Sequence, residues 1–153
     1  MRRYVQYFYI FCFSIFKADT ITTSFYSPAL GDNMYYEIVI PSSYESNQDS
    51  TYPSIYFLHG FGADYSWYSS LIDKFEGMME TGEIRESFLI KLDGFVLPYL
   101  GSMYTNSEYN GQFENYIVQD LIAHIDQTYP TINLPSYRAI MGHSMGGYGA
   151  VKL

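Results

Sequence analysis

Short apolar runs alternate with stretches of helical apolar spacing along most of the chain, and this order predicts an α/β fold. Strands are expected in residues 25–41, where two form a hairpin, and in residues 52–58, 87–92 and 137–141. The runs at 52–58 and 87–92 are nearly continuous in apolar residues, which is typical of strands buried on both faces of a sheet. The hairpin combines strong turn residues with aromatic and β-branched ones, so we expect it at the sheet edge.

Two helices are expected between these strands. The first has apolar residues at helical spacing, namely Leu71, Ile72, Phe75, Met78 and Met79. Asp64 or Ser66 is expected to cap its start, and Gly82 to end it. The second covers residues 112–129, where apolar residues recur every four positions, and it ends before Pro130. The alternation of strand and helix predicts a right-handed, mostly parallel sheet with flanking helices.

The last predicted strand runs into a Gly-x-Ser-x-Gly pattern formed by Gly142, Ser144 and Gly146. This spacing is typical of a nucleophile elbow, a sharp turn from strand to helix with a serine at its apex. Ser144 is expected to have a positive φ, which is costly for a residue with a Cβ. Gly142 and Gly146 then leave room where strand and helix pass close together. The alternative is a glycine-rich turn with an incidental serine.

A second glycine motif, His59-Gly60-Phe61-Gly62, follows the strand at 52–58. Its glycines permit a backbone excursion at the carboxyl end of a strand, where ligands bind in open α/β sheets. Residues 95–111 show no period and are rich in Tyr, Asn and Gly. We expect them to form a long loop near the same site, because irregular segments of this length are uncommon unless they are functional.

Composition narrows the possible functions. The chain has 153 residues, 48% of them hydrophobic, which suits one domain with a core. The formal net charge is -8 with only 8 Lys and Arg, so we expect no nucleic-acid partner. The single cysteine, Cys12, lies in the N-terminal segment, so the remainder has no disulfide, cysteine metal site or thiol nucleophile. We expect neither a metal nor a cofactor.

The N-terminus has the layout of a secretory signal peptide over residues 1–18. Two arginines precede an apolar run at 4–16 that is shorter than the ~20 residues needed to span a bilayer. We therefore expect a secreted, extracellular protein without stable membrane insertion after cleavage. Ala18 suits the position before the cut, whereas Phe16 is bulkier than usual, so the exact site stays open. The alternative is an N-terminal anchor that is never removed.

The motifs and their order resemble the esterase-D-like branch of the α/β-hydrolases, which includes S-formylglutathione hydrolases, feruloyl esterases and mycolyl transferases. The resemblance rests on residues 52–62, 104–107, 113–129 and 142–147, and it covers residues 25–153. It implies that residues 19–153 are the N-terminal part of an α/β-hydrolase domain, truncated after the elbow. It also implies a serine carboxylester hydrolase that acts through an acyl-enzyme on Ser144.

The resemblance further implies an oxyanion hole formed by the backbone N–H groups of Phe61 and Met145. The resemblance also makes Trp67 and Tyr104 candidate substrate contacts, for a small-molecule or carbohydrate-linked ester. Tyr65, Trp67 and Tyr68 could stack on a sugar or aryl group, but anchoring of the following helix to the core is the favoured interpretation. Asp93 is interpreted as a turn residue.

The catalytic acid and histidine of the fold normally follow the serine, in that order. Neither occurs after Ser144 in this chain. His59 is expected to brace the oxyanion loop, His143 to point away from Ser144, and His124 to lie on a solvated helix position. This chain alone is therefore expected to be inactive or nearly so. Two alternatives stay open: an acyltransferase of the same family, or a catalytically inactive truncated product.

Overall fold

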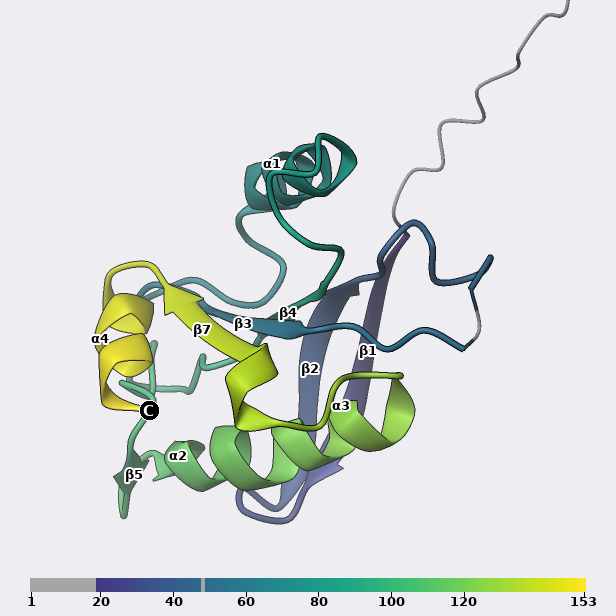
Figure 1. Ribbon diagram of the computed structural model, residues 1–153. Helices are drawn as coiled ribbons and strands as arrows, with labels where there is room; N and C mark the ends of the chain where they lie inside the picture. The colour runs from purple at the N-terminus through teal and green to yellow at the C-terminus, as the bar shows by residue number, and fades with distance from the viewer. Residues whose placement is uncertain (1–18, 48) are drawn as a thin grey trace, which may run out of the picture.

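A computed structural model describes residues 19–47 and 49–153 and shows a five-stranded sheet in the order β1-β2-β4-β3-β7 (Figure 1). The expected signal peptide at 1–18 lies outside the described residues. The strands of this sheet are β1 (Thr20–Ser27), β2 (Asp32–Val39), β3 (Ser54–Leu58), β4 (Phe88–Leu92) and β7 (Arg138–Gly142). Every strand predicted from the sequence is therefore present.

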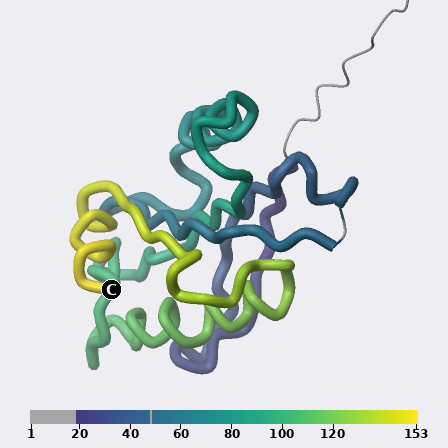
Figure 2. Tube along the Cα trace, in the orientation of Figure 1, coloured from purple at the N-terminus to yellow at the C-terminus, as the bar shows by residue number. Residues whose placement is uncertain are grey.

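The sheet is mixed, and its parallel part carries the glycine motifs. The hairpin β1–β2 and the pair β2–β4 are antiparallel, whereas β3 is parallel to both β4 and β7. Within the described part of the chain, β7 pairs with β3 alone. The carboxyl ends of β3 and β7 lie side by side, as Figure 2 also shows, because Leu58 pairs with Gly142.

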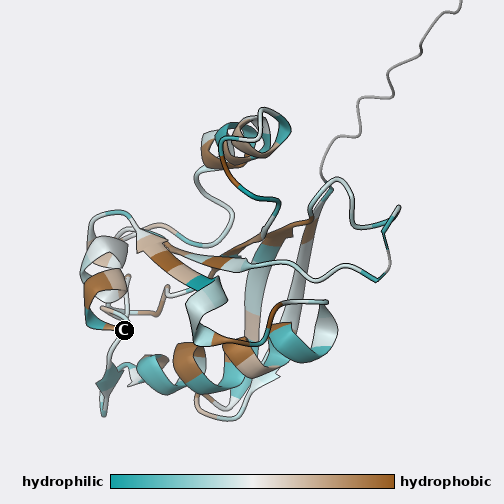
Figure 3. Ribbon diagram, viewed as in Figure 1, coloured by the Kyte–Doolittle hydropathy of each residue, from teal (hydrophilic) through white to brown (hydrophobic). Residues whose placement is uncertain are grey.

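Helices cover both faces of the sheet. Helix α1 (Ser69–Glu80) packs on one face, where the core contains Val39, Phe57, Phe75 and Leu89. The opposite face is covered by a longer rod made of α2 (Phe113–Asn115), η1 (Tyr116–Leu121) and α3 (Ile122–Thr128), and also by α4 (Met145–Lys152). Hydrophobic residues line the central strands and part of this rod (Figure 3). The predicted α/β layering is confirmed.

Two details of the helices differ from the sequence prediction. The rod at 112–129 is present, but its middle, η1, is a π-helix. Neither Asp64 nor Ser66 caps α1: the carboxylate of Asp64 accepts bonds from the N–H and hydroxyl of Ser66, and the cap residue is Tyr68 at φ 66°. Gly82, at φ 73°, follows the end of α1 as predicted.

The remaining elements are short. Strands β5 (Asn106–Ser107) and β6 (Gly111–Gln112) pair within the long loop predicted at 95–111, and the 3-10 helix η2 (Pro135–Tyr137) precedes β7. Among the helices of residues 19–47 and 49–153, none has the length and apolar character needed to cross a bilayer.

His124 is not the solvated residue that the sequence predicts. Its ring stacks on Phe25 with centroids 4.4 Å apart, and its Nε2 lies 2.9 Å from the hydroxyl of Tyr36. Burial lowers the pKa of His124 below its ordinary value. The prediction failed because β1 and β2 meet this helix face through tertiary packing, which the local sequence does not reveal.

We expect this histidine to make stability depend on pH. The unfolded chain protonates His124 near its ordinary pKa of about 6.5, whereas the folded chain resists protonation until a lower pH. The stabilisation is therefore complete above about pH 6.5 and is lost as pH falls toward the folded-state pKa. Urea unfolding at pH 7.5 and pH 5.5 checks this.

The matched variant is His124→Gln, which we expect to lose about 1 kcal/mol at pH 7.5 through the Tyr36 hydrogen bond but to show a weaker pH dependence. An equal decline in wild type and variant between the two pH values contradicts the assignment to His124.

Candidate active site

Ser144 occupies a sharp turn between β7 and α4. It precedes the first residue of α4 with φ 53° and ψ -113°, and its side chain is exposed. The turn is closed by a bond of 2.8 Å from the Gly146 N–H to the carbonyl of His143. The predicted strand-to-helix turn with positive φ at Ser144 is confirmed.

The two elbow glycines lie where a side chain cannot fit. A Cβ on Gly142 would lie 2.3 Å from the backbone of Gly146, and a Cβ on Gly146 would lie 1.9 Å from the carbonyl oxygen of Leu58. Both obstacles are backbone atoms that cannot rotate away. The predicted close approach of strand and helix therefore holds, and it fixes the position of Ser144 relative to the end of β3.

The loop at 59–62, called the oxyanion loop after the role expected for its Phe61 N–H, begins with a fully buried histidine. His59 Nδ1 lies 2.8 Å from the carbonyl of Gly60, and the N–H of Gly94 donates to His59 Nε2 at 2.8 Å. Since Nε2 accepts, the proton is assigned to Nδ1. Asp93 Oδ1, 3.4 Å from Nε2, is thus no ion-pair partner for the ring in this tautomer. His59 braces the loop, as predicted.

The oxyanion loop and the elbow meet against the loop that follows β4. A Cβ on Gly101 would lie 2.6 Å from Met145 Sδ and 3.1 Å from a ring carbon of Phe61. The N–H of Gly62 also donates to the carbonyl of Leu100 at 2.9 Å. In the described part of the chain, the N–H groups of Phe61 and Met145 donate no hydrogen bond. Both thus stay available to a ligand.

The histidine beside the nucleophile is engaged elsewhere. His143 Nδ1 lies 3.0 Å from the hydroxyl of Tyr68, which also accepts the N–H of Gly60 at 3.2 Å. His143 thus points toward the oxyanion loop and away from Ser144, as predicted. The hydrogen bonds of the three histidine rings among the described residues all go to groups other than Ser144.

Tyr104 requires a correction, because its side chain is fully buried and cannot contact a substrate here. Its hydroxyl donates to the carbonyl of His59 at 2.9 Å, and its ring fills the space left by Gly94 and Gly149. Burial raises the pKa of Tyr104 above its usual range, so the hydroxyl keeps its proton and donates. The residue is a support for the oxyanion loop.

Trp67 keeps the exposure that a substrate contact needs, with 56% of its surface accessible. Phe61 is 60% exposed, and Leu100 and Met103 of the neighbouring loop are exposed as well. Tyr65 stacks on Tyr35 of β2 instead. Sequence reasoning singled out Phe61 only for its N–H and missed its exposed ring. The sequence did contain a signal for this exposure: Phe61 lies between two glycines, so the adjacent residues provide no side chains for its ring to pack against.

The described residues contain no group of three or more His, Cys, Asp or Glu side chains that could hold a metal ion. What the arrangement offers is an exposed serine hydroxyl, together with backbone N–H groups on the elbow and on the loop at 59–62 that have no partner among the described residues. Such donors can stabilise negative charge that develops on a carbonyl oxygen during acyl transfer.

Known proteins are similar to this chain in sequence and in fold. The chain is 25% identical over 128 residues to Esterase Rv1288 of Mycobacterium tuberculosis, covering 84% of this chain and 27% of that protein. A solved ferulic acid esterase superposes with a TM-score of 0.80 at 26% identity, over 88% of this chain and 52% of that one.

More distant structures share the fold. An S-formylglutathione hydrolase from Agrobacterium tumefaciens has a TM-score of 0.65 at 21% identity, over 88% of this chain and 52% of that one. The chain thus spans about half the length of the solved esterases it matches, and these neighbours establish an α/β-hydrolase fold for the part that the chain covers. The profile of the family described as "Putative esterase" matches residues 27–153, so the chain belongs to this esterase family.

Proposed function

We propose that this chain supplies the nucleophile and the oxyanion hole of a serine carboxylester hydrolase. The observation that carries the proposal is Ser144, exposed and held at φ 53° at the start of α4, next to a loop whose Phe61 N–H has no partner among the described residues. Membership of an esterase family supports the reaction class.

In the proposed reaction, Ser144 Oγ attacks the ester carbonyl carbon while its proton passes to a base. The carbonyl oxygen becomes negatively charged and accepts hydrogen bonds from the N–H groups of Phe61 and Met145. Collapse of this intermediate breaks the bond to the alcohol oxygen, which takes a proton and leaves. Water then attacks the acyl-serine, releases the acid and returns the proton to Ser144.

The general base and its orienting acid are not supplied by the described residues in this proposal, because the rings of His59, His124 and His143 are all engaged elsewhere. A polypeptide outside this chain has to provide them. We therefore propose that the chain alone acylates slowly and turns over poorly.

For the substrate we propose a small-molecule or carbohydrate-linked ester. One neighbouring structure is a ferulic acid esterase from Anaeromyces mucronatus in complex with ferulic acid, and the exposed rings of Phe61 and Trp67 could receive a planar acyl group. Secretion is likewise proposed, on the basic and apolar N-terminal sequence alone.

Acylation by an activated ester tests the nucleophile. We expect p-nitrophenyl acetate to acetylate the chain slowly at one site, with one p-nitrophenolate released per acetyl group transferred. Peptide mass spectrometry should place the acetyl group on Ser144. Ser144→Ala should lose the modification, whereas Ser136→Ala, which removes another exposed serine, should keep it. Equal acetylation of Ser144→Ala and wild type contradicts the proposed function.

A further inference from the structure

Side chains fix the two consecutive peptide units of the oxyanion loop. The first joins His59 to Gly60: its carbonyl accepts the Tyr104 hydroxyl at 2.9 Å, and its N–H donates to the Tyr68 hydroxyl at 3.2 Å. Both polar groups of this unit are therefore held by buried or half-buried tyrosines, which come from segments far apart in the chain.

The second unit joins Gly60 to Phe61 and is held from one side. Its carbonyl lies 2.8 Å from His59 Nδ1 and accepts the N–H of Ala63 at 3.2 Å, while the Phe61 N–H has no partner among the described residues. In a planar trans peptide the N–H points opposite to the C=O. The bonds from His59 and Ala63 to the Gly60 carbonyl therefore determine the direction in which the Phe61 N–H points.

The His59 ring cannot easily give up this position. It is only 1% exposed, and its other nitrogen accepts the N–H of Gly94 at 2.8 Å. Glycine at position 60 imposes little preference of its own on the peptide orientation, because it lacks a Cβ. The preference must come from the groups that bind the peptide. On this unit they are His59 Nδ1 and the N–H of Ala63, and the shorter bond is the one to His59.

We propose that His59 is a positioning residue for the oxyanion hole, which turns the Gly60–Phe61 peptide so that its N–H faces the space beside Ser144. The inference rests on the proposed function, since it gives this N–H the oxyanion as its ligand. His59 itself touches no reacting atom. It acts through the backbone, on the peptide that follows the one held by Tyr68 and Tyr104.

Two amide variants separate the two bonds of the ring. The amide nitrogen of His59→Asn can replace Nδ1 as the donor to Gly60, whereas His59→Gln places its amide near Nε2, where it can accept from Gly94. The proposal requires the Asn variant to keep the rate of Ser144 acetylation and the Gln variant to lower it.

The readout is the rate constant for acetylation of Ser144 by p-nitrophenyl acetate in the full chain. Loss of one oxyanion-hole donor lowers rates by about 10²–10³-fold, so we expect His59→Gln to be slower by about 10- to 100-fold. His59→Asn should stay within about threefold of wild type, by the same reasoning. Thermal unfolding of all variants shows whether rate follows stability. Equal rates for Asn and Gln overturn the inference.

Nitrogen NMR of the histidine ring and of the loop amides decides the inference independently of Ser144 chemistry. We expect a proton on Nδ1 and none on Nε2 of His59. The Gly60 carbonyl and Phe61 amide resonances should move in His59→Gln and stay in place in His59→Asn. A proton on Nε2, or unmoved resonances in the Gln variant, overturns the positioning role. Absence of acetylation in wild type with these NMR results intact contradicts only the proposed function.

Discussion

Gly146→Ala is expected to lower the free energy of unfolding by more than about 3 kcal/mol, or to prevent folding. The new Cβ would lie 1.9 Å from the carbonyl oxygen of Leu58 and 2.8 Å from that of His59. Relief requires α4 to move away from the end of β3, because neither obstacle is a side chain that can change rotamer. The change would displace Ser144 together with the helix.

The neighbouring glycine provides the matched control. A Cβ on Gly147 meets only the carbonyl oxygen of Gly142, at 3.5 Å, an ordinary contact. Since alanine is favoured over glycine within a helix by about 0.5–1 kcal/mol, Gly147→Ala should be neutral or stabilising. Urea unfolding and the yield of soluble protein measure both variants. A Gly146→Ala protein that unfolds at the same urea concentration as wild type contradicts the close approach seen at the elbow.

Sequence reasoning identified the parts of the site whose conformation is determined by residues close together in the sequence. The positive φ at Ser144 follows from the spacing of glycines on either side, and the buried strands β3 and β4 follow from short apolar runs. Both signals lie within a few consecutive residues. The elbow and the oxyanion loop could therefore be recognised before any long-range contact was known.

The parts that it missed depend on contacts between distant residues. Tyr104 bonds the carbonyl of His59, 45 residues away in sequence, and nothing around Tyr104 distinguishes a buried support from an exposed substrate contact. His124 is covered by Phe25 of β1, although its place in the apolar repeat of its own helix indicates a position that faces solvent. Local sequence cannot show which helix face a hairpin from the other end of the chain will cover.

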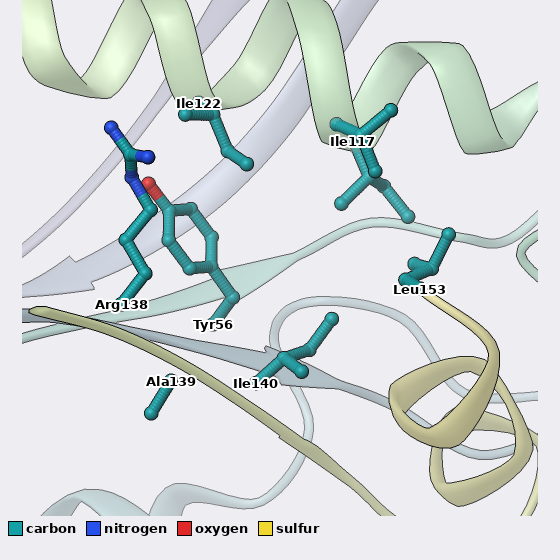
Figure 4. A pocket seen from close by; sticks show the side chains of 8 residues that line it. Tyr56, Ile117, Ile122, Arg138, Ala139, Ile140 and Leu153 are labelled. Carbon is teal, nitrogen blue, oxygen red and sulfur yellow. The ribbon is translucent and has the colours of Figure 1, made fainter. Parts of the chain in front are cut away.

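Strand β7 leaves two apolar surfaces partly open, one on each face of the sheet. A cavity of 160 Å³ lies between β7 and the rod of η1 and α3; the residues that line it are Tyr56, Ile117, Val118, Ile122, Arg138, Ala139, Ile140 and Leu153 (Figure 4). On the other face, a cavity of 220 Å³ lies between β7 and α1; its lining is Ile55, Leu71, Lys74, Phe75, Met78, Ile84 and Met141.

We expect these surfaces and the edge of β7 to make the chain on its own prone to aggregation. A strand paired on one side presents free N–H and C=O groups to other chains, and here apolar cavities adjoin it. The solved esterases that this chain matches are about twice as long. A polypeptide corresponding to their other half, taken from the same genome, should cover this edge and raise the soluble yield.

The same addition should restore turnover. A general base contributes about 10²–10⁴-fold to such reactions, so steady hydrolysis of p-nitrophenyl acetate by the 153-residue chain should be slower than that of the completed protein by at least this factor. Ser144→Ala in the completed protein is the control and should return the rate to that of the short chain or below.

Rapid hydrolysis by the short chain that depends on Ser144 contradicts the prediction, because it requires a base among histidines whose rings are all bonded elsewhere. Improved solubility without improved turnover would separate the two roles and show that the added half completes the sheet but does not supply the base.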